Sequence, residues 1–537
     1  MSSTKLAVRR SLTNIQDDYD KGNKTELENL MRAWKGIQEL PPEDLRSFFM
    51  IGGYHGEPFR GPGETSDTWW GGYCQHGTVL FPSWHRAYLM QLERALQTIP
   101  GCSDVTLPFW DECSALSADK GIPRALTDET FMLDGKRIPN PLRSFELPVA
   151  IVDQVAQDAI VYSKPAGYET VRYPLSGLVG TENDALATKA HNAQFPSYTA
   201  NVGYLNDNVT TWLNGKIRIG GKWQGEVSTK FSQCLDAPNY TLFSNTTSAG
   251  AWNKNHSTSV VPLESPHNYM HLAVGGFDYP GQGDASAIPG ANGDMGENDT
   301  AGLDPIFFFH HCFIDYTFWT WQRRHGATDS FTIDSTDTGT KYTKDNPPPA
   351  GADPDERLSM TTELKPFKNA DGKTYVTTAD CINIESQLGY TYGPGSLETY
   401  AQQTSDALTA ELADVPDGHT VRVAGINRAD IRGSFLISAY ATVDGEREYL
   451  GTEPILSRWH VEGCMNCQTH LEAQASFRLP AETATKLGAA PGGVTSGVEV
   501  EVLTREGLLG GRAFRTGAGG LTAGASADDA PFTIEIR

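Results

Sequence analysis

Residues 304–325, DPIFFFHHCFIDYTFWTWQRRH, decide the fold of this 537-residue chain. The stretch is apolar nearly all round when it is wound as a helix, so it predicts a helix buried at the centre of the molecule. Asp304 opens the stretch and resembles a helix N-cap. His310 and His311 lie inside it. Burying several imidazoles without partners is costly, and a metal ion removes that cost by taking their lone pairs.

Three more helices are expected around this one. Residues 25–40, TELENLMRAWKGIQEL, and residues 83–99, SWHRAYLMQLERALQTI, repeat apolar side chains at three- and four-residue steps, a pattern typical of a helix with one buried face. Ser83 has the side chain of an N-cap, and a shorter helix is expected over residues 266–274. Residues 100–250 are rich in Pro, Gly and Asn and have few periodic runs, so we expect this part to be irregular.

The pattern becomes that of β-strands in the last quarter of the chain. Residues 433–443, GSFLISAYATV, and residues 497–503, GVEVEVL, alternate in polarity, and Asp444-Gly445 is a hairpin-type turn. The Gly/Ala-rich residues 515–530 are expected to form a flexible loop.

These patterns predict two domains. We expect residues 1–395 to form a mainly α domain, a four-helix bundle with many loops, and residues 396–537 to form an all-β sandwich. The composition shifts ahead of this boundary, in the Pro-rich stretch NPPPAGADPDE.

The charge balance excludes some classes of partner. Lys and Arg number 43 against 66 Asp and Glu, which gives a net charge of −23. Nucleic acids and anionic membranes need a basic surface, so neither is an expected partner. No apolar run is long enough to span a membrane. The N-terminus lacks the apolar core of a secretory signal, so an intracellular protein is expected.

The histidines point to a metal centre with two ions. His267 and His271 are four residues apart and share a helical face, while His76 and His85 are nine apart. The pair at 267 and 271 is not a zincin motif, because Asn268 stands where that motif has its glutamate. All candidate ligands are imidazoles, which suit Zn, Cu, Fe and Ni, whereas structural zinc would normally draw on cysteine. Two sets of three neutral histidines hold two cations without cancelling their charge, which favours a dicopper site that binds O₂.

At these residues the sequence resembles a known family. Residues 76–93, HGTVLFPSWHRAYLMQLE, and 304–315, DPIFFFHHCFID, resemble the two copper signatures of tyrosinases and related type 3 copper proteins. The stretches 107–112, LPFWDE, and 261–276, VPLESPHNYMHLAVGG, look most like fungal-type latent tyrosinases without a signal peptide. The resemblance runs from about residue 25 to 395 and continues into the C-terminal part.

The resemblance implies a ligand set for two copper ions. In that set the first copper is bound by His55, His76 and His85, and the second by His267, His271 and His311. In the family's histidine doublet the second residue is the ligand, so His310 is expected to support the site without binding copper. The resemblance also implies a thioether bond between Cys74 and His76; a free buried cysteine is the alternative.

The implied activity is the oxidation of small phenols with O₂. Monophenols would be hydroxylated in the ortho position, and o-diphenols would be oxidised to o-quinones, as in melanin biosynthesis. Residues matching Glu264 and Asn268 are proposed in tyrosinases to hold a water that deprotonates the phenol. Alternatively, Glu264 stabilises a helix N-terminus and Asn268 orients a ligand histidine. Homo-oligomerisation is left open.

The resemblance also suggests which residues control access to the copper ions. The motif LGYTYGPGS at 388–396 resembles the end of the catalytic domain, and the domain after it resembles the one that shields the site in latent proenzymes. Leu456 is the candidate pocket blocker, with Ile455 or Trp459 as alternatives. The Cys464 and Cys467 pair would either deliver copper, since soft thiolates suit Cu(I), or form a disulfide.

Four further residues have candidate roles around the pocket. Asn298 falls near a position that commonly carries a small apolar gate residue, and Leu272 is expected to line the pocket mouth. Phe307 is expected to pack under the site. Asp315 is expected to brace a ligand or to pair with an arginine. Two other functions stay open: a catechol or o-aminophenol oxidase without monophenolase activity, and a haemocyanin-like O₂ carrier.

Overall fold

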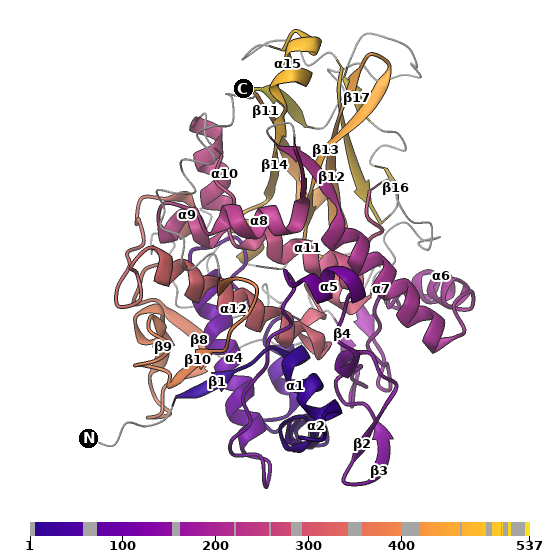
Figure 1. Ribbon diagram of the computed structural model, residues 1–537, viewed down its shortest axis with the longest axis vertical. Helices are drawn as coiled ribbons and strands as arrows, with labels where there is room; N and C mark the ends of the chain where they lie inside the picture. The colour runs from indigo at the N-terminus through magenta and orange to yellow at the C-terminus, as the bar shows by residue number, and fades with distance from the viewer. Residues whose placement is uncertain are drawn as a thin grey trace.

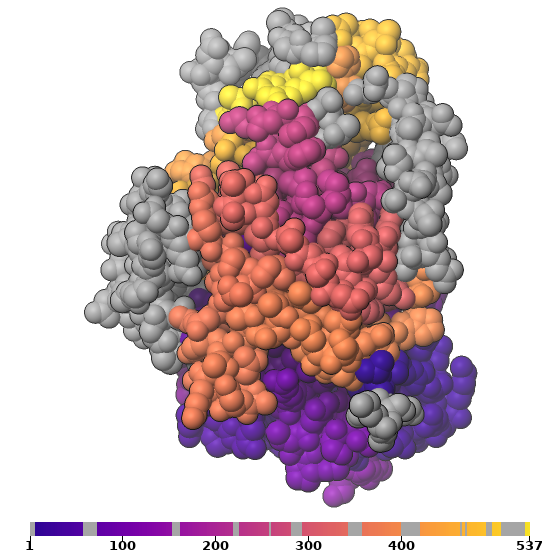
Figure 2. Space-filling model, turned by 90° about the vertical axis from the view of Figure 1, so that its left-hand side faces the viewer, coloured from indigo at the N-terminus to yellow at the C-terminus, as the bar shows by residue number. Residues whose placement is uncertain are grey.

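The molecule has a helical part and a strand-rich part at opposite ends (Figure 1). In Figure 2 the N-terminal residues make up one end and the C-terminal residues the other. The computed structural model describes residues 6–56, 72–152, 162–219, 222–256, 259–280, 293–341, 357–398, 419–461, 464, 466–489, 497–505, 507–508, 514–516 and 532–537. The predicted flexible loop at 515–530 lies almost entirely outside these residues. Within them, no helix is both long and apolar enough to cross a membrane.

The helices lie mostly in the first 325 residues. They are α1 (Leu12–Asp20), α2 (Thr25–Gln38), α3 (Phe48–Gly53), α4 (Phe81–Gln97), α5 (Ala115–Lys120), α6 (Glu182–Asn192), α7 (Tyr198–Asn214), α8 (Glu226–Cys234), α9 (Tyr240–Ser244), α10 (Thr246–Asn255), α11 (Glu264–Gly275), α12 (Ile306–Arg324) and α15 (Ala481–Leu487). The four helices predicted from the sequence correspond to α2, α4, α11 and α12. As expected, every residue of α12 from Ile306 to Gln322 is buried, and α4 packs against both α2 and α12.

The two predicted N-caps, Ser83 and Asp304, were wrong. Helix α4 begins at Phe81 with Leu80 as its N-cap and Pro82 in its first turn, where a missing N–H costs nothing. Ser83 therefore lies inside the helix, and its hydroxyl donates to the Leu80 carbonyl at 3.2 Å. Helix α12 begins at Ile306 after Pro305, although Asp304 does accept a hydrogen bond from the Ile306 N–H at 3.2 Å.

The expectation of an irregular region at 100–250 was also wrong. Five helices, α6 to α10, lie between residues 182 and 255. In α7 the buried residues Leu205, Asn208, Val209, Trp212 and Leu213 recur at helical spacing. Asparagine occupies one of these core positions, so the apolar stripe is broken in the sequence.

The C-terminal strands form the predicted sandwich. One sheet has the order β14-β11-β18, and the other has the order β13-β12-β15-β16, with β17 also paired to β15. These strands are β11 (His419–Asn427), β12 (Phe435–Val443), β13 (Glu446–Ile455), β14 (Glu472–Leu479), β15 (Val498–Thr504), β16 (Gly507–Leu508), β17 (Phe514–Thr516) and β18 (Thr533–Ile536). Asp444 and Gly445 form the turn between β12 and β13 with φ of 54° and 84°, as the sequence predicted.

Short pairs of strands connect the loops of the helical part. Strand β1 pairs in parallel with β10, and the other pairs are antiparallel. Their bounds are β1 (Ala7–Arg9), β2 (Thr130–Leu133), β3 (Lys136–Pro139), β4 (Ile151–Val152), β5 (Ser163–Lys164), β6 (Lys216–Ile219), β7 (Lys222–Gly225), β8 (Glu363–Lys368), β9 (Tyr375–Thr377) and β10 (Tyr390–Tyr392).

A buried carboxylate joins the sandwich to the helical part. Glu226, the first residue of α8, accepts hydrogen bonds from Tyr269 and Tyr279 of the helical part at 2.9 and 3.0 Å. It also accepts from Tyr449 and from the Thr452 N–H of β13 at 3.0 and 2.8 Å. Four donors compensate the burial of this carboxylate, so β13 is held directly against α11 and α8.

Asp315 forms a buried ionic network on α12, which bears out the expectation that it pairs with an arginine. It accepts from Arg86 of α4 at 2.6 Å and lies 3.5 Å from Arg9 of β1. Tyr390 and Tyr392 of β10 each donate a hydroxyl to it at 2.6 Å. Burial raises the pKa of Asp315, but the two guanidinium groups and the tyrosines outweigh burial and lower it below its usual value.

Replacing Asp315 with Asn should lower the free energy of unfolding by about 3–5 kcal/mol at neutral pH, because it leaves Arg86 buried without its counter-ion. The pKa of Asp315 is lowered in the folded state, so its stabilisation is complete above the unfolded pKa and is lost as the pH falls through the folded value. The difference in the free energy of unfolding between wild type and variant, measured by chemical denaturation, should therefore become smaller below about pH 4. Asp104→Asn, at an exposed site, serves as the control; an equal loss in both variants would refute this role.

Candidate metal centre

The core of the helical part holds two groups of histidines. One group is His55, His76 and His85; the other is His267, His271, His310 and His311, and within each group the potential ligand atoms lie within 4.8 Å of one another. All seven side chains are buried. Helices α4, α11 and α12 carry five of them, His55 follows α3 by two residues, and His76 lies in the loop before α4.

Apart from His310, five of these histidines hydrogen-bond through Nδ1 to a group that accepts. The acceptors are the Asn298 carbonyl for His55 (3.2 Å), Glu264 for His76 (3.1 Å), the Phe81 carbonyl for His85 (2.8 Å), Asn268 Oδ1 for His267 (2.9 Å) and the Met295 carbonyl for His271 (2.7 Å). Carbonyls and carboxylates cannot donate, so Nδ1 carries the proton in each ring. The Nε2 atom is then left with a free lone pair, which is the usual arrangement of metal-binding histidines.

The Nε2 atoms converge in both groups. Those of His55 and His76 are 3.1 Å apart, and that of His311 lies 3.2 Å from His267 and 3.4 Å from His271. The contact between His55 and His76 joins two bare lone pairs, which cannot hydrogen-bond to each other, so it is unfavourable unless a cation lies between them. Nδ1 of His311 has no hydrogen-bond partner among the described residues. Nε2 of His85 has no hydrogen-bond partner among the described residues. The donor set therefore fits one metal ion in each group.

The electrostatics of the site keep these imidazoles neutral. Burial lowers the pKa of His55, His85, His267, His271 and His311 well below the usual value, and the neighbouring imidazoles lower it further. Neutral imidazole is the form that binds a metal. Both groups are therefore ready to accept a cation at neutral pH.

Comparisons with known proteins decide the family. Residues 45–324 match the model of the common central domain of tyrosinase. A tyrosinase of Hahella sp. strain CCB-MM4 is 50% identical over 504 residues, covering 89% of each chain. The chain belongs to the tyrosinase family. A tyrosinase of Aspergillus oryzae is 44% identical over 503 residues, covering 88% of each chain. The solved tyrosinase of Burkholderia thailandensis at low pH superimposes with a TM-score of 0.80 and 49% identity, covering 94% of this chain and 96% of that one.

Tyrosinases use a dinuclear copper centre with O₂, so this chain is a copper oxidoreductase with two copper ions as its cofactor. The sequence resemblance pointed to fungal-type members. The relatives from Hahella and Burkholderia, at 50% and 49% identity, are nevertheless more similar to this chain than the tyrosinase of Aspergillus oryzae at 44%. A structure of Aspergillus oryzae pro-tyrosinase shares the fold at 17% identity, with a TM-score of 0.60, covering 94% of this chain and 90% of that one.

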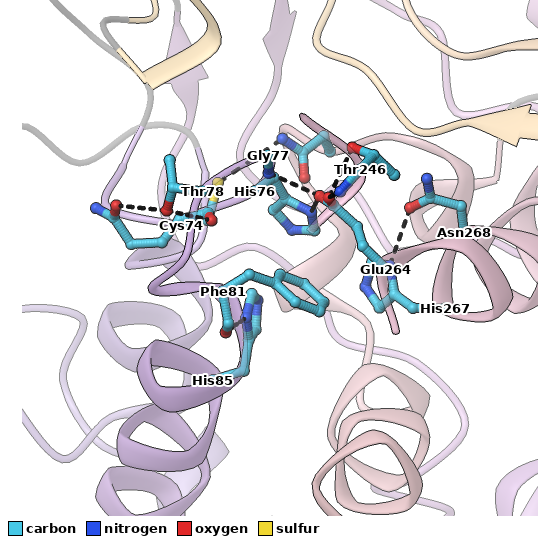
Figure 3. A network of polar contacts seen from close by, with 12 residues as sticks. Cys74, His76, Gly77, Thr78, Phe81, His85, Thr246, Glu264, His267 and Asn268 are labelled. Atoms are coloured by element: carbon cyan, nitrogen blue, oxygen red, sulfur yellow. Dashed lines mark hydrogen bonds and ion pairs between the residues drawn. The ribbon is translucent and has the colours of Figure 1, made fainter. Parts of the chain in front are cut away.

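We name His55, His76 and His85 the first copper group, and His267, His271, His310 and His311 the second copper group. Glu264 lies between the first copper group and α10 (Figure 3). Its Oε1 accepts from His76 Nδ1 at 3.1 Å and from the Gly77 N–H at 2.8 Å. Its Oε2 accepts from the Thr246 N–H at 2.9 Å and from the Thr246 hydroxyl at 2.8 Å. Burial raises the pKa of Glu264, but these hydrogen bonds outweigh it and lower the pKa to about 2. The carboxylate is therefore ionised and fixes the orientation of His76.

Asn268 bridges the second copper group and the sandwich. Its Oδ1 accepts from His267 Nδ1 at 2.9 Å, and its Nδ2 donates to the Pro454 carbonyl of β13 at 3.2 Å. This geometry agrees with the alternative in which Asn268 orients a ligand histidine. It also means that a strand of the sandwich takes up one of the two N–H donors of this amide.

A small cavity lies between the first copper group and the sandwich. Its walls include Cys74, His76 and Asn298 from the helical part and Leu456 and Arg458 from the sandwich. Its volume is about 10 Å³, which has room for about one water molecule and none for a phenol ring. Leu456 is buried and belongs to the core cluster of the helical part, so this side chain fills space next to His76.

The other candidate residues at this face are placed as follows. Ile455 packs in the core of the sandwich, and the Trp459 ring lies under the Arg505 guanidinium at 4.6 Å. Leu272 is fully buried and is absent from the described residues that line the cavity. Phe307 stacks on His311 with ring centroids 4.0 Å apart, as expected for a residue that packs under the site.

Arg458 contacts the first copper group directly, which sequence reasoning missed. Its Nη2 donates to the His55 carbonyl at 3.1 Å and to Cys74 Sγ at 3.2 Å, and its Nη1 lies 3.3 Å from Asp299. Asn298 Nδ2 also approaches Cys74 Sγ at 3.8 Å. A buried arginine from the sandwich therefore contacts the cysteine for which the thioether bond was predicted.

The Cys464 and Cys467 pair is a disulfide in the structure. Its sulfur atoms are not thiolates in this form, so they cannot bind Cu(I) until the pair is reduced. Copper delivery by the reduced pair stays a prediction. Cys467 and His470 line the cavity beside His76, so the pair lies close to the first copper group.

Proposed function

We propose that this protein is a tyrosinase that hydroxylates monophenols in the ortho position and oxidises o-diphenols to o-quinones, and that the sandwich keeps it latent. In this proposal His55, His76 and His85 bind the first copper, and His267, His271 and His311 bind the second. The observation that carries the assignment is the convergence of Nε2 atoms at 3.1–3.4 Å, with Nδ1 held by an acceptor in five of these six rings. Bound copper supplies the activation of O₂ and the coordination of the phenol oxygen.

The protein's own residues orient the ligands and handle the phenol proton. A free phenol has a pKa near 10, so a group near the copper ions must accept its proton. Ionised Glu264 lies beside His76, and Asn268 lies beside His267. In the proposal, these two side chains hold a water molecule that takes the phenol proton once the sandwich has moved away and Asn268 Nδ2 is released from Pro454.

Latency in this proposal has two causes. Leu456 occupies the space next to His76 that the phenol ring needs, and the Pro454 carbonyl accepts one N–H of the Asn268 amide. We place the boundary between the catalytic domain and the shielding domain at residues 395 and 396. Proteolysis near this boundary, or a variant that vacates the pocket, would expose the copper ions to substrate.

A second candidate function is a catechol or o-aminophenol oxidase without monophenolase activity. One observation favours it: Glu264 already accepts four hydrogen bonds, from His76, Gly77 and Thr246. A carboxylate engaged in this way acts as a brace for His76 and has little capacity left to hold a water. The two candidates differ in whether Glu264 takes part in proton transfer.

Glu264→Gln in the activated enzyme should separate these candidates. The amide can still accept from His76 Nδ1, but it is neutral and a far weaker base. If Glu264 assists deprotonation, the kcat for a monophenol should fall about 100-fold or more relative to the kcat for the matching o-diphenol, which is the size of effect usual for general base catalysis. Copper content measured by elemental analysis is the control. No monophenol turnover in the activated wild type would support the second candidate. A parallel loss for both substrates would instead show that Glu264 acts only as a brace for His76.

A further inference from the structure

The second histidine group has a fourth imidazole that the proposed ligand set does not use. His310 is fully buried on α12, and its potential ligand atom lies within 4.8 Å of those of His267, His271 and His311. Its ring is 4.9 Å from that of His271 and 5.2 Å from that of His267, measured between centroids. The corresponding distances for His311 are 5.6 and 4.8 Å. His310 is thus as close to the other two rings as His311 is.

Glu112 orients this fourth ring. Its Oε1 accepts from His310 Nδ1 at 2.6 Å, and both side chains are completely buried. With Nδ1 protonated, Nε2 carries a free lone pair, as it does in the five rings anchored above. A carboxylate that holds the far side of an imidazole in this way is a common support for a metal-binding histidine.

The Nε2 atom of His310 has no hydrogen-bond partner in the described part of the chain. Buried polar atoms of folded proteins are nearly always paired, and an unpaired one calls for an explanation such as an ion. The other histidine group differs here, since it contains only three rings.

We infer that His310 is a capturing ligand of the second copper: the apo group offers four imidazoles to the incoming ion. Cu(I) readily accepts four nitrogen ligands, so all four rings can hold it during loading. The working centre must keep a coordination position open for O₂ and phenol. In the working centre His310 would therefore not remain a ligand, and His267, His271 and His311 would hold the ion. The inference rests on the proposed function for the identity of the metal.

His310→Asn tests this role with little disturbance. The Asn Nδ2 occupies nearly the place of the histidine Nδ1, so it keeps the hydrogen bond to Glu112 and removes only Nε2. Apo full-length protein is titrated anaerobically with Cu(I) against a chromogenic chelator. We expect the wild type to take up two ions, and the variant to bind one of them about tenfold or more weakly, the lower end of the loss usual when a support of a metal site is removed.

Two further variants complete the design. Glu112→Gln keeps the ring but weakens its anchor, and should lower the affinity for the same ion by a smaller factor. His191→Asn is the matched control, because His191 is equally buried but donates to the Pro174 carbonyl away from both groups; its binding curve should be unchanged. Binding of both ions by His310→Asn within twofold of wild type would overturn the inference.

The outcomes separate this inference from the proposed function. A wild-type protein that fails to bind two copper ions would count against the dicopper proposal itself. Should His310→Asn not fold, Glu112→Gln decides the question, and wild-type affinity in that variant would equally overturn the role of His310.

Discussion

Replacing His271 with Asn should leave one tightly bound copper ion per chain and lower phenol turnover by roughly three orders of magnitude or more. The substitution removes an Nε2 donor that lies 3.4 Å from that of His311, so only His267 and His311 remain of the three ligands proposed for the working centre, and His310 is not one of its lasting ligands. Oxidation of a phenol with O₂ needs both metal ions, and a centre with one ion loses nearly all of the catalysed rate.

Elemental analysis and turnover of a catechol measure this result. His325→Asn is the control, because its ring lies outside both groups and contacts the Leu235 carbonyl at 2.9 Å. The control should bind two copper ions and stay active. Two tightly bound ions in His271→Asn would show that the second group was assigned wrongly.

Replacing Leu456 with Ala should raise kcat/KM for small phenols about tenfold or more without proteolysis. In the proposed function this side chain fills the substrate space beside His76, so phenol would bind only to the fraction of molecules in which the sandwich has moved. If that fraction is about one tenth or less, the apparent affinity is reduced by the same factor. Truncating the leucine makes room in the closed form and removes this penalty.

Leu450→Ala is the matched control for this variant. Leu450 lies on the same strand, β13, but packs in the core of the sandwich. A general loosening of the sandwich would activate both variants equally. We expect activation of Leu456→Ala alone, with a kcat/KM that approaches that of protein cleaved near residue 395. An unchanged kcat/KM in Leu456→Ala would show that Leu456 does not block the pocket.

The helices and the histidine groups could be predicted because the signals are local. The run of apolar residues in 306–322 could only be buried, and the four-residue spacing of His267 and His271 places both on one face of α11. The alternating strands of the sandwich and the Asp444-Gly445 turn were equally clear. In each case the physical constraint acts between residues close together in the chain.

The supports of the site could not be predicted, because they join distant segments. The carbonyls of Asn298 and Met295, which fix His55 and His271, belong to a loop more than twenty residues away from either histidine. Glu112 reaches His310 across 198 positions, and Arg458 reaches His55 across 403. Every residue has a backbone carbonyl, so the sequence does not show which carbonyls hold the histidines; only the folded structure does.

The helix α7 was missed for a different reason. Asn208 occupies a core position because its amide donates to the Ala273 and Phe277 carbonyls at 2.8 and 3.1 Å, which caps the end of α11. A polar residue that satisfies another segment interrupts the apolar stripe of its own helix. The apolar periodicity of the sequence is then too weak to predict the helix, although the buried residues of the folded helix do follow helical spacing.

Anomalous diffraction at the copper edge from crystals of the copper-loaded protein tests the dicopper assignment most directly. Two peaks of similar height are predicted, one bound by Nε2 of His55, His76 and His85 and the other by Nε2 of His267, His271 and His311, each at about 2.0–2.1 Å as for other metal–imidazole bonds. A single peak, or copper bound elsewhere with both histidine groups vacant, would contradict it.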